Sequence, residues 1–153
     1  CLGLSQSDAQ RQGLSSPTQL PGTTWATTHG ANGNCVLAVK TDGSLWVWGS
    51  NNTGQLGLNE QGQHYTSAAT SSPKQCGTDT NWHMAWSNGG GLSYATKTDG
   101  SLWVWGESSA TARLGLNEAN AHYSSPTQLG SEYNWKQSWQ NFASYRTMLF
   151  KEI

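Results

Sequence analysis

The chain has 153 residues, of which 35% are hydrophobic and only 11% are charged, and its net charge is −1. This near-neutral balance argues against a nucleic-acid-binding protein, because phosphate binding needs a basic surface, and against binding to anionic membranes. No run of 18 apolar residues occurs, so no transmembrane helix is predicted. The nine Trp and five Tyr residues argue against disorder. Aromatic, uncharged polar and glycine residues together indicate an all-β protein.

The first predicted strands lie between residues 16 and 30. Residues 16–20 read as a short strand that contains a proline, which suits the edge of a sheet. Trp25 then shares one face with the residues two and four positions further on, which is the period of a strand. The same pattern follows Trp82 and Trp135.

A β-hairpin is predicted next. Residues 35–39 and 44–48 are apolar runs on either side of an Asp-Gly turn, and this dipeptide is the strongest short-range hairpin signal. We expect residues 37–39 to pair antiparallel with residues 45–47. In the equivalent hairpin we expect Ala95 to pair with Leu102.

An internal repeat organises the rest of the sequence. Residues 40–49 recur unchanged as residues 97–106, a match of ten residues at a spacing of 57. Two further motifs occur three times each: Leu-Gly-Leu at 2–4, 56–58 and 114–116, and Ser-Pro-Xaa-Gln at 16–19, 72–75 and 125–128. The unit is about 55 residues long and holds four short antiparallel strands, which is typical of a propeller blade.

The chain holds just under three of these repeats, which we divide into 1–49, 50–106 and 107–153. Leu2 and Leu4 at one end, and Met148 and Phe150 at the other, are strand residues of an unfinished repeat. Unpaired strand edges invite another chain, so we expect all four side chains to contact further polypeptide. That polypeptide is either the remainder of a longer array or another copy of this chain. Packing of three repeats into a non-propeller β fold is the third alternative.

These motifs resemble the repeat of the regulator of chromosome condensation family. Residues 41–57, Thr-Asp-Gly-Ser-Leu-Trp-Val-Trp-Gly-Ser-Asn-Asn-Thr-Gly-Gln-Leu-Gly, carry the likeness. The copy that begins at Thr98 departs after Gly106, where residues 107–113 replace the Asn-rich turn. The resemblance implies a seven-bladed β-propeller used as an interaction surface. The Pro-Gly-Thr-Thr-Trp segment looks most like copies from phages and environmental bacteria.

No catalytic, cofactor-binding or metal-binding residues are predicted. None of the four His residues lies three to five residues from another His or a Cys, which is the spacing expected of metal ligands. Asp42 and Asp99 are turn residues. Cys35 and Cys76 read as small core residues, since Cys76 takes the place of Leu20 and Leu129 in the other repeats. We therefore expect a protein that is not an enzyme.

The Trp residues and the Asn-rich turns have two interpretations. The first is that the Trp side chains fill the space between neighbouring blades. The second is a carbohydrate-binding surface, in which aromatic rings stack on sugars and amide side chains bind their hydroxyl groups. The candidate residues for such a glycan or partner surface are Asn51, Asn52, Gln55, Asn59 and Gln63.

The sequence therefore predicts a structural or adhesive module that binds a protein, with a glycan as a second partner class and a virion or the extracellular space as its setting. No binding to nucleic acid and no insertion into a membrane are expected. The alternative is a regulatory interaction module that acts as an exchange factor or as an enzyme inhibitor.

Overall fold

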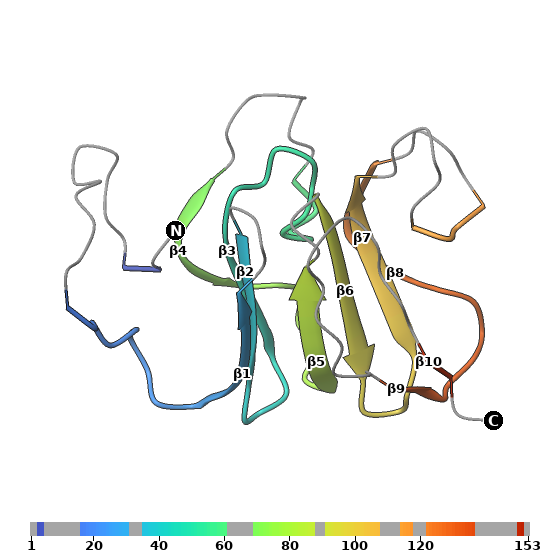
Figure 1. Cartoon of the computed structure of the whole chain (residues 1–153), viewed down its shortest axis with the longest axis horizontal. Helices are drawn as coiled ribbons and strands as arrows, with labels where there is room; N and C mark the ends of the chain where they lie inside the picture. The colour runs from blue at the N-terminus through green and yellow to red at the C-terminus, as the bar shows by residue number, and fades with distance from the viewer. Residues whose placement is uncertain are drawn as a thin grey trace.

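The fold is all-β, as the sequence predicts. The computed structural model describes residues 3–4, 16–30, 35–60, 69–87, 91–107, 114–117, 122–136 and 150–151. Within them lie two four-stranded antiparallel sheets and a two-stranded ladder (Figure 1). The two larger sheets stand side by side and are called blade 1 and blade 2 below.

Blade 1 is an antiparallel meander. Its strands follow the chain order β1-β2-β3-β4. Their bounds are β1 Trp25–Gly30, β2 Cys35–Lys40, β3 Leu45–Gly49 and β4 Thr70–Gln75.

Blade 2 repeats this arrangement in the order β5-β6-β7-β8. Its strands are β5 Trp82–Ser87, β6 Leu92–Lys97, β7 Leu102–Glu107 and β8 His122–Gln128. The structural units therefore run from Trp25 and from Trp82, whereas the sequence division placed boundaries after residues 49 and 106. The two divisions differ only in phase, because a tandem repeat can be cut at any point of its period.

A third unit begins in the same way. β9 (Trp135–Lys136) pairs with β10 (Phe150–Lys151) in the antiparallel sense. Lys151 lies opposite Trp135, just as Lys40 lies opposite Trp25 in blade 1. The third copy of the repeat thus starts with the register of the first.

The predicted hairpins form, with one correction of register. Leu37 pairs with Val47 in blade 1, as expected. In blade 2, however, Ala95 lies opposite Trp103, and Leu102 lies opposite Thr96. The expected pairing of Ala95 with Leu102 was one residue out, because the turn is one residue longer than that pairing would allow.

The proline-containing segments lie at sheet edges, where the missing N–H costs no ladder hydrogen bond. Pro73 is in β4 and Pro126 is in β8, each the last strand of its blade. Residues 16–20 carry the same motif but form no strand. Among the described residues, no strand pairs with this segment.

The main core lies between the blades. It joins aliphatic residues of β2 and β3 to Trp and Ala residues of blade 2, and Cys35 and Cys76 belong to it as predicted. A second cluster on the other side of blade 2 includes Leu92, Leu102 and Val104, with Trp135 packed against it. Blade 2 is therefore covered on both faces, and this is why every residue of β6 is buried.

Candidate functional site

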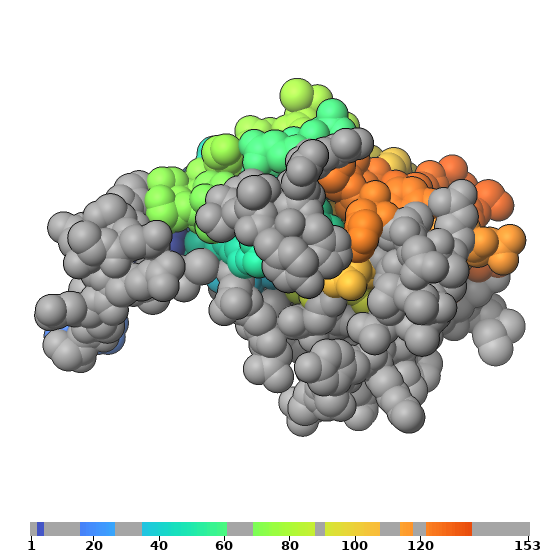
Figure 2. Space-filling view, turned by 90° about the horizontal axis from the view of Figure 1, so that it is seen from above, coloured from blue at the N-terminus to red at the C-terminus, as the bar shows by residue number. Residues whose placement is uncertain are grey.

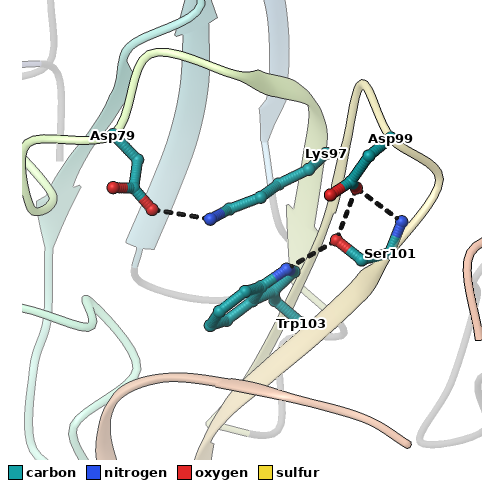
Figure 3. A network of polar contacts seen from close by, with 5 residues as sticks. All are labelled: Asp79, Lys97, Asp99, Ser101 and Trp103. Carbon is teal, nitrogen blue, oxygen red and sulfur yellow. Dashed lines mark hydrogen bonds and ion pairs between the residues drawn. The ribbon is translucent and has the colours of Figure 1, made fainter. Parts of the chain in front are cut away.

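Each hairpin contains a chain of polar contacts that runs from an aspartate to a tryptophan. In blade 2, Asp99 Oδ1 accepts hydrogen bonds from Ser101 N at 2.9 Å and Ser101 Oγ at 2.7 Å. Ser101 Oγ in turn accepts a hydrogen bond from Trp103 Nε1 at 2.9 Å (Figure 3). The bonds from Ser101 hold the pKa of Asp99 below its usual value, because they favour the charged carboxylate.

Blade 1 builds the same chain from the same residue types. Asp42 Oδ1 accepts from Ser44 N at 2.9 Å and Ser44 Oγ at 2.6 Å, and Trp46 Nε1 donates to Ser44 Oγ at 2.8 Å. The pKa of Asp42 is lowered for the same reason. The aspartates thus act as turn residues, and each turn orients the tryptophan two residues beyond its serine.

A lysine lies against this tryptophan in each blade. In blade 2, Lys97 Nζ is 4.8 Å from the ring centroid of Trp82 and 4.1 Å from that of Trp103. It also forms an ion pair with Asp79 Oδ2 at 2.6 Å (Figure 3). Asp79 lies in the segment that links β4 to β5, and Lys97 is only 9% exposed. The cation is therefore enclosed by two rings and a carboxylate, which stabilise its charge.

The equivalent lysine of blade 1 has the rings without the carboxylate. Lys40 Nζ is 3.6 Å from the ring centroid of Trp46 and 4.9 Å from that of Trp25. Among the described residues, no carboxylate pairs with Lys40. Gly22 stands three residues before Trp25, where Asp79 stands three residues before Trp82. We call Trp25, Trp46 and Lys40 the lysine cage of blade 1.

The Asn-rich turn after β3 joins the two blades. Asn51 Oδ1 accepts a hydrogen bond from Leu56 N at 3.0 Å, which closes the turn. The carbonyl oxygen of Gln55 then accepts from Ser93 Oγ at 2.7 Å and from Trp105 Nε1 at 2.9 Å, both in blade 2. Seen from above, the blue-green atoms of this turn lie against the orange atoms of β8 (Figure 2). The turn therefore belongs to the contact between blades.

Because of this placement, some of the residues predicted for glycan or partner binding are buried and others are exposed. Asn51 is fully buried and Gln55 is 8% exposed, so both side chains lie inside the turn and not on its surface. Residues 51–53, Asn-Asn-Thr, also match the sequence for N-glycosylation, and the acceptor asparagine is the buried Asn51. Asn52 and Asn59 are exposed, and Asn59 Oδ1 accepts a hydrogen bond from Ser125 Oγ at 3.1 Å. Gln63 lies outside the described residues.

The residues predicted to contact further polypeptide are described in part. Leu2 and Met148 lie outside the described residues. Leu4 is half-buried, and a Cβ atom on the preceding Gly3 would lie 3.0 Å from Trp48 Nε1. Residue 3 is therefore in close contact with blade 1. For Phe150 the backbone is placed, opposite Lys136 in the ladder of the third unit.

Sequence reasoning missed one recurring contact between the blades. The carbonyl oxygen of Gly43, in the hairpin turn of blade 1, accepts a hydrogen bond from Trp82 N at 3.0 Å. The carbonyl oxygen of Gly100 accepts in the same way from Trp135 N at 3.1 Å. The repeated pairing of Asp-Gly with a tryptophan about 35–40 residues later in the sequence was the available signal.

The described residues offer little material for metal or redox chemistry. No group of three or more His, Cys, Asp or Glu side chains gathers among them. Cys35 and Cys76 are buried free thiols, and burial raises the pKa of both. The part of the chain that is described also contains no helix long and apolar enough to cross a membrane.

Comparisons with known proteins agree with the repeat architecture. Residues 42–84 match the family model of the regulator of chromosome condensation (RCC1) repeat. A search of curated protein sequences finds no match.

Solved structures of propeller proteins resemble the fold at low sequence identity. Prp20p of Saccharomyces cerevisiae, described with its binding to Gsp1p and histones, has a TM-score of 0.60 at 17% identity over 74% of this chain and 27% of its own. The same yeast protein bound to Kap60 gives 0.62 at 19% identity over 74% and 26%. Human WBSCR16 gives 0.51 at 22% identity over 68% and 24%.

These similarities show the fold and give no support to a phage or environmental bacterial origin. The chain spans about a quarter of the length of the propeller proteins that it matches. Its four-stranded sheets correspond to blades of those larger propellers. Residues 42–84 therefore resemble an RCC1 repeat, and the blades have the fold of RCC1 propeller blades.

Proposed function

We propose that this chain is a non-catalytic binding module whose blades present a rigid surface to a partner. The observation that supports this most directly is the use of its polar side chains. Asp42 and Asp99 close hairpin turns, Asn51 and Gln55 close the Asn-rich turn, and Asp79 pairs with Lys97. These polar side chains thus stabilise the turns and the contact between the blades. No cofactor or metal is part of the proposal.

A surface built in this way is stiff. Three kinds of contact join blade 1 to blade 2: the buried core, the Asn-rich turn and the backbone bond from Trp82 N to Gly43 O. A preorganised surface loses little conformational entropy on binding, which favours affinity. Such a module suits a structural or adhesive role, and we propose a virion or the extracellular space as its setting.

We propose a protein as the partner, either the remainder of a longer chain or further copies of this one. Trp25 of blade 1 is half-buried, whereas the equivalent Trp82 of blade 2 is buried in the core between the blades. A glycan is the second partner class, supported by the exposed amides of Asn52 and Asn59. The near-neutral charge supports neither nucleic acid nor membrane as a partner.

Two measurements test this proposal. Sedimentation equilibrium of the whole chain over a range of concentrations should show self-association, and a Leu4→Asp variant should weaken it. Binding to a glycan array, if present, should weaken in Asn52→Ala. A cooperatively folded monomer that binds no glycan and gains no stability from any added propeller segment would overturn the proposal.

A regulatory interaction module is the second candidate. It is supported by the likeness to Prp20p, which is described as binding Gsp1p and histones. Because the chain covers only 27% of that protein, the test is direct binding of the chain to purified Gsp1p. Titration calorimetry that detects no heat of binding, with Prp20p as the positive control, would exclude this candidate.

A further inference from the structure

Trp82, Trp103 and Lys97 form a second lysine cage in blade 2. The two cages have nearly the same arrangement of aromatic rings. In blade 1 the ring centroids of Trp25 and Trp46 are 6.1 Å apart, at an angle of 85°. In blade 2 those of Trp82 and Trp103 are 5.8 Å apart, at 77°. Each pair holds a lysine ammonium group over its rings. The chain therefore contains the same cation-binding arrangement twice, and the two copies can be compared directly.

The cages differ in what faces the ammonium group. In blade 2 the carboxylate of Asp79 lies 2.6 Å from Lys97 Nζ. In blade 1 Gly22 takes that sequence position, and a Cβ atom there would meet only Trp25 Nε1, at 3.7 Å. The φ angle of Gly22 is 98°, which side chains rarely adopt, so the linker itself is poorly suited to carry an acidic residue. Among the described residues, no carboxylate therefore pairs with Lys40 as Asp79 pairs with Lys97.

We propose that the lysine cage of blade 1 is a binding site for a carboxylate, supplied by an Asp or Glu side chain of a polypeptide that docks on this face. The inference rests on the proposed function, since it names a chemical feature of the protein partner. Lys40 would then be a specificity-determining residue. It favours partners that bring an acidic side chain and disfavours those that bring a basic one.

Continuity with the contact between the blades identifies a polypeptide as the source. Asp79 reaches Lys97 from the linker that leads out of blade 1, and Val47 of blade 1 and Trp105 of blade 2 belong to one buried apolar cluster. A docking chain can likewise bring an acidic and an apolar side chain together. A free small acid would bring the charge alone, to a half-exposed lysine in water, where an isolated ion pair contributes little.

The charge of the cage supports the same assignment. Lys40 is half-buried and held close to Trp46, so part of its hydration is already lost. A carboxylate that approaches Nζ gains a charge-assisted hydrogen bond. The second cage shows that the arrangement accepts a carboxylate at hydrogen-bond distance without displacing the lysine from its rings.

The test uses the whole chain and the indole N–H signals of its Trp residues in NMR spectra. The probe is a capped peptide with the sequence of residues 77–81, Gly-Thr-Asp-Thr-Asn, compared with a version that carries Asn in place of Asp. The Asp peptide should shift the Trp25 and Trp46 signals saturably, and the Asn peptide should bind about tenfold more weakly. Lys40→Met should abolish the shifts, whereas Lys40→Arg should retain them.

Blade 2 provides the matched control in the same sample. The Trp82 and Trp103 signals should not shift in the unmodified chain, because Asp79 already pairs with the lysine of that cage. In Asp79→Asn they should respond to the Asp peptide as the blade 1 signals do. Thermal melting of each variant checks that the fold is kept.

Three results would overturn the inference. They are no shift with the Asp peptide, an unchanged shift in Lys40→Met, and binding of acetate as tight as that of the peptide, which would indicate a site for free small acids. None of these results bears on self-association or glycan binding, so the proposed function is tested separately.

Discussion

Blade 1 and blade 2 contain the same ten residues, 40–49 and 97–106, in different surroundings. Inside the hairpin the two copies agree. Both form the series of hydrogen bonds from Asp through Ser to Trp, and the hydrogen-bond distances match within 0.1 Å. Outside it they diverge. Trp105 Nε1 donates to Gln55 O, whereas Trp48 Nε1 is buried and has no hydrogen-bond partner among the described residues.

The difference shows which interactions are local and which depend on a neighbour. The hydrogen bonds of the hairpin span only two residues, so any copy of the motif forms them. The partners of Trp105 and Lys97 come from the preceding blade or from the linker that leaves it. A blade is therefore completed by the unit before it, and the predictions below test that statement.

The largest effect is expected where the hairpin turn meets the next blade. A Cβ atom on Gly100 would lie 1.8 Å from the carbonyl oxygen of Tyr133, and φ is 82° at this residue. The left-handed backbone costs roughly 1–2 kcal/mol and the clash with backbone a further 1–3 kcal/mol, so Gly100→Ala should lower the free energy of unfolding by about 3 kcal/mol. Gly77→Ala is the control, since Gly77 has φ 67° but nothing within 4 Å. Equal losses in chemical denaturation would refute the clash.

Alkaline pH should weaken the contact between the blades. Burial, with a smaller effect from the charge of Asp79, raises the pKa of Cys76 from 9.0 to about 12. A raised pKa means that the folded state favours the protonated thiol, so stability is full below pH 9.0 and is lost as the pH rises toward 12. At about pH 10.5 the loss should be about 2 kcal/mol. Urea titrations across this range should show it, and Cys76→Ala should reduce the slope; identical slopes would contradict the prediction.

The two buried tryptophans should respond unequally to replacement by phenylalanine. Both lose volume, but only Trp105→Phe also loses a hydrogen bond to the Asn-rich turn. A net hydrogen bond contributes about 1 kcal/mol, so Trp105→Phe should cost about 1 kcal/mol more than Trp48→Phe. Paired denaturation curves measure the difference, and a larger loss for Trp48→Phe would reverse our interpretation of the two surroundings.

Removing the carboxylate from blade 2 should make its cage resemble that of blade 1. Asp79→Asn keeps the shape of the side chain and removes the ion pair with Lys97. Because Asp79 is 53% exposed, solvent screening limits the expected loss to about 1 kcal/mol. The difference from the unmodified chain should shrink as salt is added. Lys74→Gln, which removes an exposed pair with Glu60, is the control and should change stability less.

The smallest difference is expected between the two turn aspartates. Hydrogen bonds from Ser44 and Ser101 lower the pKa of Asp42 and Asp99 below 3.8. A lowered pKa means that stability is present above the unfolded value and is lost as the pH falls through the folded value. NMR titration should give matching values for both residues, and Ser44→Ala should raise the pKa of Asp42 alone. Clearly different values in the unmodified chain would show that the hairpins are not equivalent.

Much of the fold could be predicted from the sequence because the signals are local or repeated. The Asp-Gly turn predicted both hairpins, the period of about 55 residues predicted the blades, and the place of Cys76 among equivalent leucines predicted its burial. Residues 16–20 were predicted as a strand and form none. A strand needs a partner for its backbone groups, and a motif carries no information on whether that partner is present.

The candidate site was predicted less well, for a related reason. The Asn-rich turn was interpreted as a polar surface because asparagine and glutamine are usually exposed. In the structure Asn51 and Gln55 turn inward, since a tight turn packed against another blade must satisfy its own backbone groups. The aromatic residues and lysines were visible in the sequence, but their stacking was not, because the cage joins residues from different strands.

The sequence by itself determined the strands, the hairpin turns and the order of the blades, since each depends on neighbouring residues or on a repeated motif. Only the tertiary structure decided which copy of each motif is enclosed. Lys97 and Lys40 are followed by the same nine residues in the sequence, yet Lys97 pairs with Asp79, whereas no carboxylate among the described residues pairs with Lys40. Burial and ion pairing are set by what lies across the contact between blades, and that depends on packing between segments distant in the chain.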